Sequence, residues 1–250
     1  MSFKELHQQG TFLLVNVHDV GAAIIAEAAG ATALGTTSSG HAYTLGREDG
    51  VGAMTRGEVA EQAAAICAVV DIPLSVDAEN GWGHSPEEVA ETIRVLASTG
   101  AAGASIEDWS GDAEMGFYDR ELALERIVAA VETAASLPDP FVICARAEAF
   151  LYGVPNPMEE ALARLQSFAG AGADCLYAPG PRDRASLGRI VTEAGGPVNA
   201  LIGVGSSLTM TDAAEIGVRR VSVGGSLYRA TMGRFEALVR QLVETGDFSL

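Results

Sequence analysis

Two carboxylates close a short apolar run in the stretch Ser75–Trp82, whose sequence is SVDAENGW. Residues i and i+2 of an extended strand project from one face, so Asp77 and Glu79 converge if the strand continues through them. Further along the chain, Glu107 and Asp108 end another apolar run. Brought together in a partly dehydrated cleft, such carboxylates repel one another unless their pKa values rise or a cation lies among them.

The cation that suits these carboxylates is a hard divalent ion. Oxygen ligands favour Mg²⁺, with Mn²⁺ as the alternative, and Mg²⁺ keeps several waters and needs only one or two direct carboxylates. The four histidines and three cysteines form no closely spaced cluster that would select a softer metal. The acidic strand ends therefore predict a Mg²⁺ site.

An arginine and a small polar loop are candidates for binding an anionic substrate. Arg146 ends an apolar run, and its guanidinium suits a carboxylate or phosphoryl group. The alternative is a structural ion pair with Glu148 or with one of the other acids. Hydroxyls and backbone N–H groups suited to an anion follow an earlier run, at Thr37, Ser38, Ser39 and Gly40.

Three further residues lie near predicted strand ends. Trp82 either walls an apolar part of the substrate or packs in the core. His41, in the small polar loop, is the preferred acid/base, and a structural histidine is the alternative. Asn199 is a candidate for substrate binding. The remaining acid/base candidates are His18, Tyr43, Tyr152 and Glu148.

Short runs rich in Val, Ile and Leu alternate with longer segments of helical period. The predicted strands are Phe12–Asn16, Ala31–Thr36, Pro73–Asp77, Gly103–Glu107, Phe141–Arg146, Asp174–Ala178, Pro197–Leu201 and Arg220–Val223. The predicted helices are Val20–Ala29, Arg56–Val69, Pro86–Ser98, Asp119–Ala135, Met158–Ala169, Asp183–Glu193, Thr209–Ile216 and Leu227–Glu244. Eight alternations favour an α/β fold that closes into a (β/α)₈ TIM barrel, with its chemistry at the C-terminal strand ends.

Length and composition bound the protein class. No Pro-rich, Ser-rich or charged linker divides the 250 residues, which predicts one domain over residues 1–250. A net charge of −17 argues against nucleic-acid and anionic-membrane partners. No apolar run is long enough to span a bilayer and no signal-peptide core is present, so we expect a cytoplasmic location.

Six motifs in this order resemble the isocitrate lyase/phosphoenolpyruvate mutase superfamily: TTSSGHAYTLGREDG, DAENGWG, GASIEDW, FVICARAEAF, GADCLYAPG and GVRRVSVGGSLYRA. The resemblance runs from about Phe12 to about Gly233. It implies a (β/α)₈ barrel, Mg²⁺, and chemistry through the enolate of a pyruvate-like 2-oxo acid.

The resemblance also implies roles for individual residues. Asp77, Glu79 and Glu107 are similar to the carboxylates that hold the metal directly or through water. Asp49 is similar to an acid that reaches the metal site, and Arg146 to the arginine that contacts substrate. The residues similar to the loop that binds the substrate's carboxylate end are Thr36, Thr37 and Ser38.

The sequence departs from its relatives in the loop Asp108–Gly116. The Lys, Cys and His of the isocitrate and methylisocitrate lyase motif are missing, as are the Lys and Asn of the phosphonate mutases. The metal half of the site is kept while the reaction-specific half differs, which argues against the ordinary isocitrate lyase reaction.

We therefore predict a Mg²⁺-dependent lyase that acts on a small 2-oxo or 2-hydroxy carboxylate through a metal-bound enolate. Decarboxylation or hydrolysis of an oxaloacetate-like substrate is favoured, because it demands least of a loop acid. The alternatives are a phosphonate P–C mutase or hydrolase, a non-catalytic 2-oxo acid binding protein, and a barrel that binds a phosphate ester at Gly203–Ser207 and Gly224–Ser226. Because family members commonly exchange C-terminal helices, we expect a homodimer or homotetramer.

Overall fold

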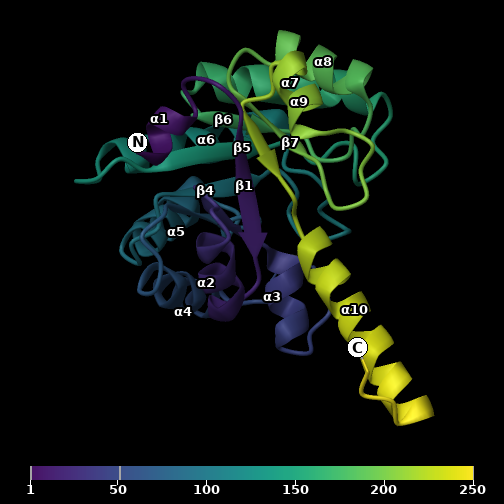
Figure 1. The fold of residues 1–250 in the computed structure, drawn as a ribbon. Helices are drawn as coiled ribbons and strands as arrows, with labels where there is room; N and C mark the ends of the chain where they lie inside the picture. Colours follow the sequence, from purple (N-terminus) through teal and green to yellow (C-terminus); the bar gives the residue numbers. More distant parts are fainter. Residues whose placement is uncertain (1, 51, 250) are drawn as a thin grey trace.

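Eight parallel strands close into a barrel in the computed structural model, which describes residues 2–50 and 52–249. Each strand pairs with the next along the chain, and the last returns to the first (Figure 1). The strands are β1 (Phe12–Val17), β2 (Leu34–Thr36), β3 (Leu74–Asp77), β4 (Gly103–Glu107), β5 (Val142–Arg146), β6 (Cys175–Tyr177), β7 (Val198–Leu201) and β8 (Arg220–Ser222). The predicted (β/α)₈ barrel is confirmed, with all eight strands in the predicted places.

Helices link the strands, and the eight predicted helices are all present. They are α2 (Val20–Ala28), α4 (Arg56–Cys67), α5 (Pro86–Ala97), α6 (Arg120–Ala135), α7 (Pro157–Gly170), α8 (Arg184–Glu193), α9 (Met210–Ile216) and α10 (Ser226–Thr245). Two short helices were not predicted, α1 (Phe3–Leu6) and α3 (Ser38–Thr44). Within the described residues, no helix combines the length and the apolar character needed to cross a membrane.

Local sequence signals set the helix ends. The side chains of Thr55 and Ser85 each accept a hydrogen bond from the backbone N–H three residues further on. In turn, the carboxylates of Glu58 and Glu88 accept the backbone N–H of Thr55 and Ser85. This reciprocal capping satisfies N–H groups that the first helical turn leaves free. At the other end, Gly217 closes α9 with a φ of 93°, a conformation that costs glycine least.

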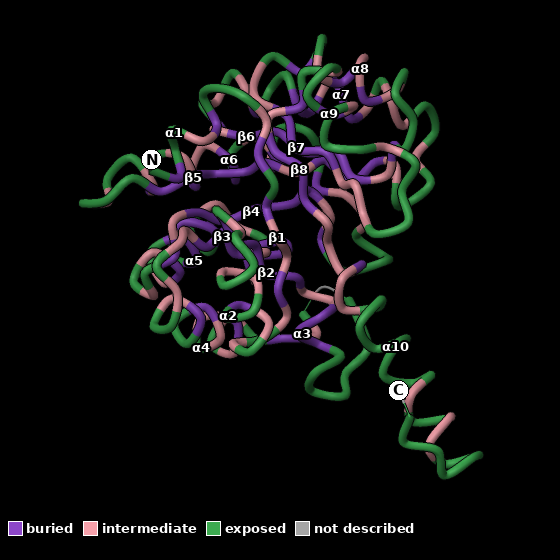
Figure 2. Tube along the Cα trace, viewed as in Figure 1, coloured by how far each residue is buried: buried purple, intermediate pink, exposed green. Residues whose placement is uncertain are grey.

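The core lies between the barrel wall and the surrounding helices. The apolar side chains of β2 to β5 are fully buried, Leu34, Leu74, Ile106 and Ile143 among them, and Leu165 of α7 packs in the same cluster. Figure 2 shows the strands mostly buried, although Leu13 of β1 is 37% exposed, and most of α10 exposed. The barrel wall is therefore a rigid support for side chains at its C-terminal end.

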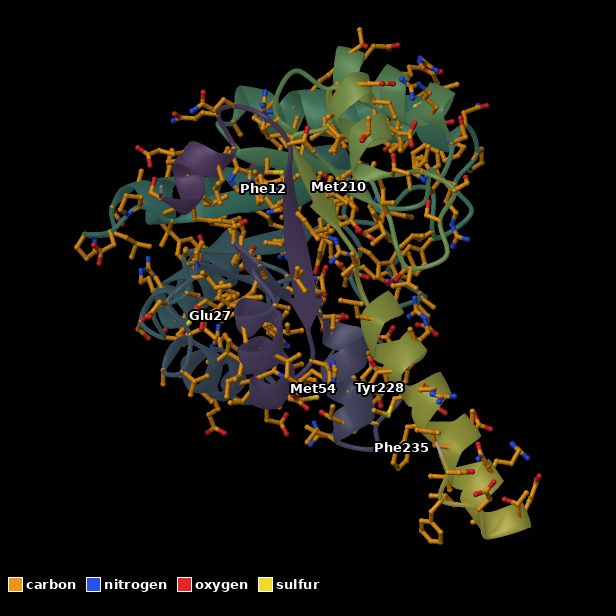
Figure 3. The ribbon with its side chains drawn as sticks, viewed as in Figure 1. Phe12, Glu27, Met54, Met210, Tyr228 and Phe235 are labelled. Carbon is orange, nitrogen blue, oxygen red and sulfur yellow. The ribbon has the colours of Figure 1, made fainter. Side chains whose placement is uncertain are left out.

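The last helix does not pack as its apolar pattern suggested. Only Ser226 of α10 is buried, whereas Phe235 is 61% exposed and Val243 is 80% exposed. Figure 1 shows α10 projecting away from the barrel, and Figure 3 shows Phe235 on the projecting part. The apolar face of this helix is therefore not covered by its own barrel.

Candidate active site

Arg146, the last residue of β5, gathers three carboxylates at the C-terminal end of the barrel. Its Nη1 lies 2.8 Å from Asp77, its Nη2 lies 3.1 Å from Glu107, and its Nε lies 2.8 Å from Glu148. Strand register explains part of this arrangement, because Glu107 of β4 is paired directly with Arg146. The ion pairs that the sequence left as an alternative for Arg146 are therefore present.

Asp77 is fixed by its neighbours in the barrel wall. Its backbone N–H donates to Thr36 Oγ1 at 2.8 Å, and its side-chain Oδ2 accepts from the Ser38 N–H at 3.1 Å. The predicted small polar loop is in fact the start of α3, where Thr37 is the N-cap and its hydroxyl lies 3.1 Å from Ser39 Oγ. The backbone N–H predicted to meet a substrate anion at Ser38 thus binds Asp77.

Glu79 reaches the site by a different route from the one its spacing suggested. Strand β3 ends at Asp77, and Glu79 has a φ of 46°, so extended geometry does not continue through it. Its carboxylate instead accepts the Gly52 N–H at 2.7 Å, across the barrel end. The i, i+2 argument for Asp77 and Glu79 is therefore wrong, although the two charges do lie close enough to influence each other.

Negative charge at this end of the barrel exceeds positive charge. Burial raises the pKa of Glu79 to about 7, and burial also raises the pKa values of Glu107 and Glu148. Burial alone would lower the pKa of Arg146, but the carboxylates around it raise that pKa well above its ordinary range. Partial loss of water and the charge of Asp77 raise the pKa of Asp49, on the loop between α3 and α4.

This donor set fits a hard divalent cation. Arg146 pairs with Asp77, Glu107 and Glu148, and Glu79 and Asp49 add further carboxylates at this end of the barrel, where burial raises the pKa values of Asp49, Glu79, Glu107 and Glu148. Within residues 2–50 and 52–249, however, no three His, Cys, Asp or Glu side chains converge closely enough to enclose a metal ion. A cation that takes one or two carboxylates and keeps its waters, as Mg²⁺ does, is the kind that suits this geometry.

Two predicted site residues make no contact with the carboxylates around Arg146 among the hydrogen bonds of the described residues. His41 is 8% exposed; burial lowers its pKa, and the charges that act on it are those of Glu58 and Arg47. Asn199 lies two residues short of the end of β7, and its amide bonds Arg220 and Ser222 inside the barrel. The expectation that Asn199 stands at a strand end is wrong.

Trp82 packs against the core, and its indole N–H donates to the Met54 carbonyl at 2.7 Å. The packing interpretation therefore describes this residue, and a contact with substrate stays a prediction. The other acidic motif also carries a tryptophan, Trp109, two residues after Glu107. Its ring stacks on that of Tyr152, with the centroids 4.0 Å apart.

Sequence patterns alone assign too little weight to Glu148 as a member of the charged cluster. It is 1% exposed, and it is bound to Arg146 through its side chain and to Asp108 through its backbone N–H at 2.8 Å. The signal was available in the spacing Arg146–Ala147–Glu148, which places two opposite charges two residues apart just as β5 ends.

A cavity of about 510 Å³ occupies the half of the rim formed by β6, β7 and β8. The loops Gly203–Ser207 and Gly224–Ser226 line it, together with Arg182 and Arg229. A Cβ on Gly225, which lines the cavity, would lie 2.6 Å from Ser39 Oγ, so the cavity reaches the start of α3, where the Ser38 N–H binds Asp77. A larger surface depression, of about 730 Å³, lies between α5 and α6, and no strand-end residue lines it.

This chain is similar to known proteins in sequence and in fold. The model of the phosphoenolpyruvate phosphomutase family matches residues 3–243. Oxaloacetate decarboxylase from Paraburkholderia xenovorans (strain LB400) is 31% identical over 207 residues, which are 79% of this chain and 66% of that protein. A solved structure from Burkholderia cenocepacia J2315 has a TM-score of 0.94 at 40% identity and covers 99% of this chain and 88% of that one. Oxaloacetate acetylhydrolase, solved in complex with its product oxalate, has a TM-score of 0.87 at 27% identity, over 100% of this chain and 88% of that one.

Proposed function

Because the chain belongs to the phosphoenolpyruvate phosphomutase family, within the isocitrate lyase/phosphoenolpyruvate mutase superfamily of lyases and mutases, we propose that it is a Mg²⁺-dependent lyase of small 2-oxo or 2-hydroxy carboxylates. The reaction passes through an enolate of a pyruvate-like acid. The observation that carries the proposal is the Arg146 guanidinium among Asp77, Glu107 and Glu148 at the C-terminal end of the barrel.

Each group in this cluster has a distinct task. Asp77, Glu79 and Glu107 would hold Mg²⁺, directly or through its waters, and the ion would supply stabilisation of negative charge on the 2-oxo oxygen. The guanidinium of Arg146 would bind the substrate carboxylate. Glu148 stays bound to Nε and keeps the guanidinium plane in place.

The favoured reaction is decarboxylation or hydrolysis of an oxaloacetate-like substrate. The loop Asp108–Gly116 offers no Lys, Cys or His, and loss of carbon dioxide needs no acid at the leaving group. The cavity beside the carboxylates, with Arg182 and Arg229, suits the second carboxylate of such a substrate. A phosphonate P–C mutase or hydrolase ranks second, because the loop also lacks the Lys and Asn of those enzymes.

The test is calorimetric titration of the metal-stripped protein with oxalate, a mimic of the pyruvate enolate, with and without Mg²⁺. We expect binding that requires Mg²⁺ and that is lost in Asp77→Ala. Asp71→Ala is the matched control, because Asp71 is exposed and precedes β3 at the opposite end of the barrel. Oxalate binding that ignores Mg²⁺ or survives Asp77→Ala would overturn the proposal, and binding without turnover of any 2-oxo acid would identify a binding protein.

We also propose that the protein is a homo-oligomer built through α10. The exposed apolar residues of this helix include Phe235, Val239 and Val243, which lie at spacings of four residues and so share one face. An apolar face that its own barrel does not cover is stabilised by burial against a second copy.

A further inference from the structure

Under the function proposed above, the enolate that forms when a group leaves C3 must receive a proton at that carbon. The loop Asp108–Gly116 holds no Lys, Cys or His that could donate it. The charges that act on His41 come from Glu58 and Arg47, away from the carboxylates, and His84 lies 2.9 Å from the Tyr118 hydroxyl. Glu148 is engaged with Arg146, and the His18 ring lies 3.7 Å from Asp19, which leaves the tyrosines Tyr43 and Tyr152 of the acid/base candidates.

Three aromatic rings form a stack beside the carboxylates, and we call Trp109, Phe117 and Tyr152 the aromatic stack. Tyr152 lies flat on Trp109, with centroids 4.0 Å apart and planes 9° apart. Phe117 presents its edge to both rings, at 5.1 Å from Trp109 and 6.0 Å from Tyr152. A backbone bridge also pairs Trp109 with Phe117, so the loop after β4 holds the phenol ring in a fixed orientation.

The aromatic stack joins the loop after β4 to the loop after β5, and these are the two strands that end in Glu107 and Arg146. Tyr152 follows Arg146 by six residues. Between them the Leu151 N–H donates to the Glu148 carbonyl at 2.9 Å, and this hydrogen bond closes a turn directly after β5. Leu151 itself lines the cavity beside the carboxylates. Tyr152 is 45% exposed, so a ligand entering the site can reach it.

The charged groups at the site act on this hydroxyl. Burial raises the pKa of Tyr152 to about 12, with contributions from the carboxylates of Glu107, Glu148 and Asp49, against the opposing effect of Arg146. Glu107 ends β4 and Glu148 follows β5, and the ring of Tyr152 stacks on Trp109 directly after β4, so the ring lies at the end of the barrel where these groups gather. At neutral pH the hydroxyl is protonated and is available as a donor.

We propose that Tyr152 is the catalytic acid that protonates C3 of the enolate, and that Trp109 is its positioning residue. When the bond from C3 to the leaving carboxyl breaks, carbon dioxide departs and the electron pair remains in the enolate. The C2–C3 double bond then takes the proton from the phenol, which forms a C3–H bond and leaves a tyrosinate. Water returns a proton to the tyrosinate and completes the cycle.

Exchange of the pyruvate methyl protons with D₂O tests this step without knowledge of the natural substrate. The same proton transfer run in reverse removes a methyl proton, and ¹H NMR follows the loss of the methyl signal in the presence of Mg²⁺. Tyr152→Phe keeps the ring on Trp109 and removes only the hydroxyl. We expect exchange to slow by about 10²-fold or more, the range of a general acid, while oxalate affinity is unchanged.

Tyr228→Phe is the matched control, because this tyrosine stacks on Tyr43 rather than on the aromatic stack. It should exchange pyruvate as the unchanged protein does. Trp109→Ala should slow exchange, and Trp109→Phe should restore most of it, since an aromatic face is kept.

Two results would overturn the assignment of Tyr152. One is exchange in Tyr152→Phe at the rate of the unchanged protein; the other is an unchanged protein that binds oxalate but does not exchange pyruvate. Failure of the proposed function is distinguishable from both, because it removes Mg²⁺-dependent oxalate binding itself.

Discussion

Replacing Glu79 with glutamine should stabilise the metal-free protein at alkaline pH. Glu79 is 4% exposed, and its carboxylate accepts the Gly52 N–H. Its pKa is raised from 4.5 to about 7 by burial, which means that the folded protein holds this charge at a cost. At about 1.4 kcal/mol for each pKa unit, the ionised carboxylate costs the fold about 3 kcal/mol.

The sign of the pH dependence follows from proton binding. Between about pH 4.5 and 7 the unfolded chain has released the Glu79 proton while the folded chain still holds it. The folded state therefore binds more protons, and the free energy of unfolding falls as the pH rises through this window. Glutamine carries no such charge and can still accept the Gly52 N–H, so Glu79→Gln removes this loss.

Urea unfolding in EDTA measures the effect. At about pH 8 the free energy of unfolding of Glu79→Gln should exceed that of the unchanged protein by about 3 kcal/mol, and at about pH 4 the two should agree. Saturating Mg²⁺ should reverse the order, because the ion stabilises the protein that retains the carboxylate. Glu87→Gln, exposed on α5, is the control and should change little. Equal stabilities at pH 8 in EDTA would refute the reasoning.

Three other changes test separate parts of the structure. Gly180→Ala should destabilise the fold by about 1–3 kcal/mol in urea unfolding, because its φ is 127° and a Cβ would lie 2.5 Å from that of Phe150. Gly153→Ala, with positive φ but open space around it, should cost less. Phe235→Asp should shift the protein toward the monomer in light scattering, and an unchanged mass would contradict assembly through α10. His41→Gln should leave Mg²⁺-dependent oxalate affinity intact, since the charges acting on His41 are those of Glu58 and Arg47. A large loss of oxalate affinity would mean that His41 does belong to the site.

The two short helices, α1 and α3, could have been predicted from their capping residues. The stretch Ser2–Glu5 carries the pattern of a reciprocal cap, and α1 does begin there. Thr37 is likewise an N-cap, and α3 follows it directly. These short helices were missed because a few residues show no apolar period, which is the signal that revealed the longer ones.

The sequence by itself determined the barrel and the set of charged residues at its C-terminal end. Eight apolar runs of strand length, alternating with helical patterns, suffice for this, because burial and period are local properties of the chain. Asp77, Glu107 and Arg146 were found as the last residues of their runs, and those runs do end there.

Only the tertiary structure decided how these residues meet. The pairing of β4 with β5 sets Glu107 beside Arg146, and the positive φ of Glu79 turns its carboxylate toward Gly52. The stacking of Tyr152 on Trp109 joins two loops that follow different strands. Such contacts depend on strand register and loop closure across the barrel, and neither leaves a periodic pattern in the chain.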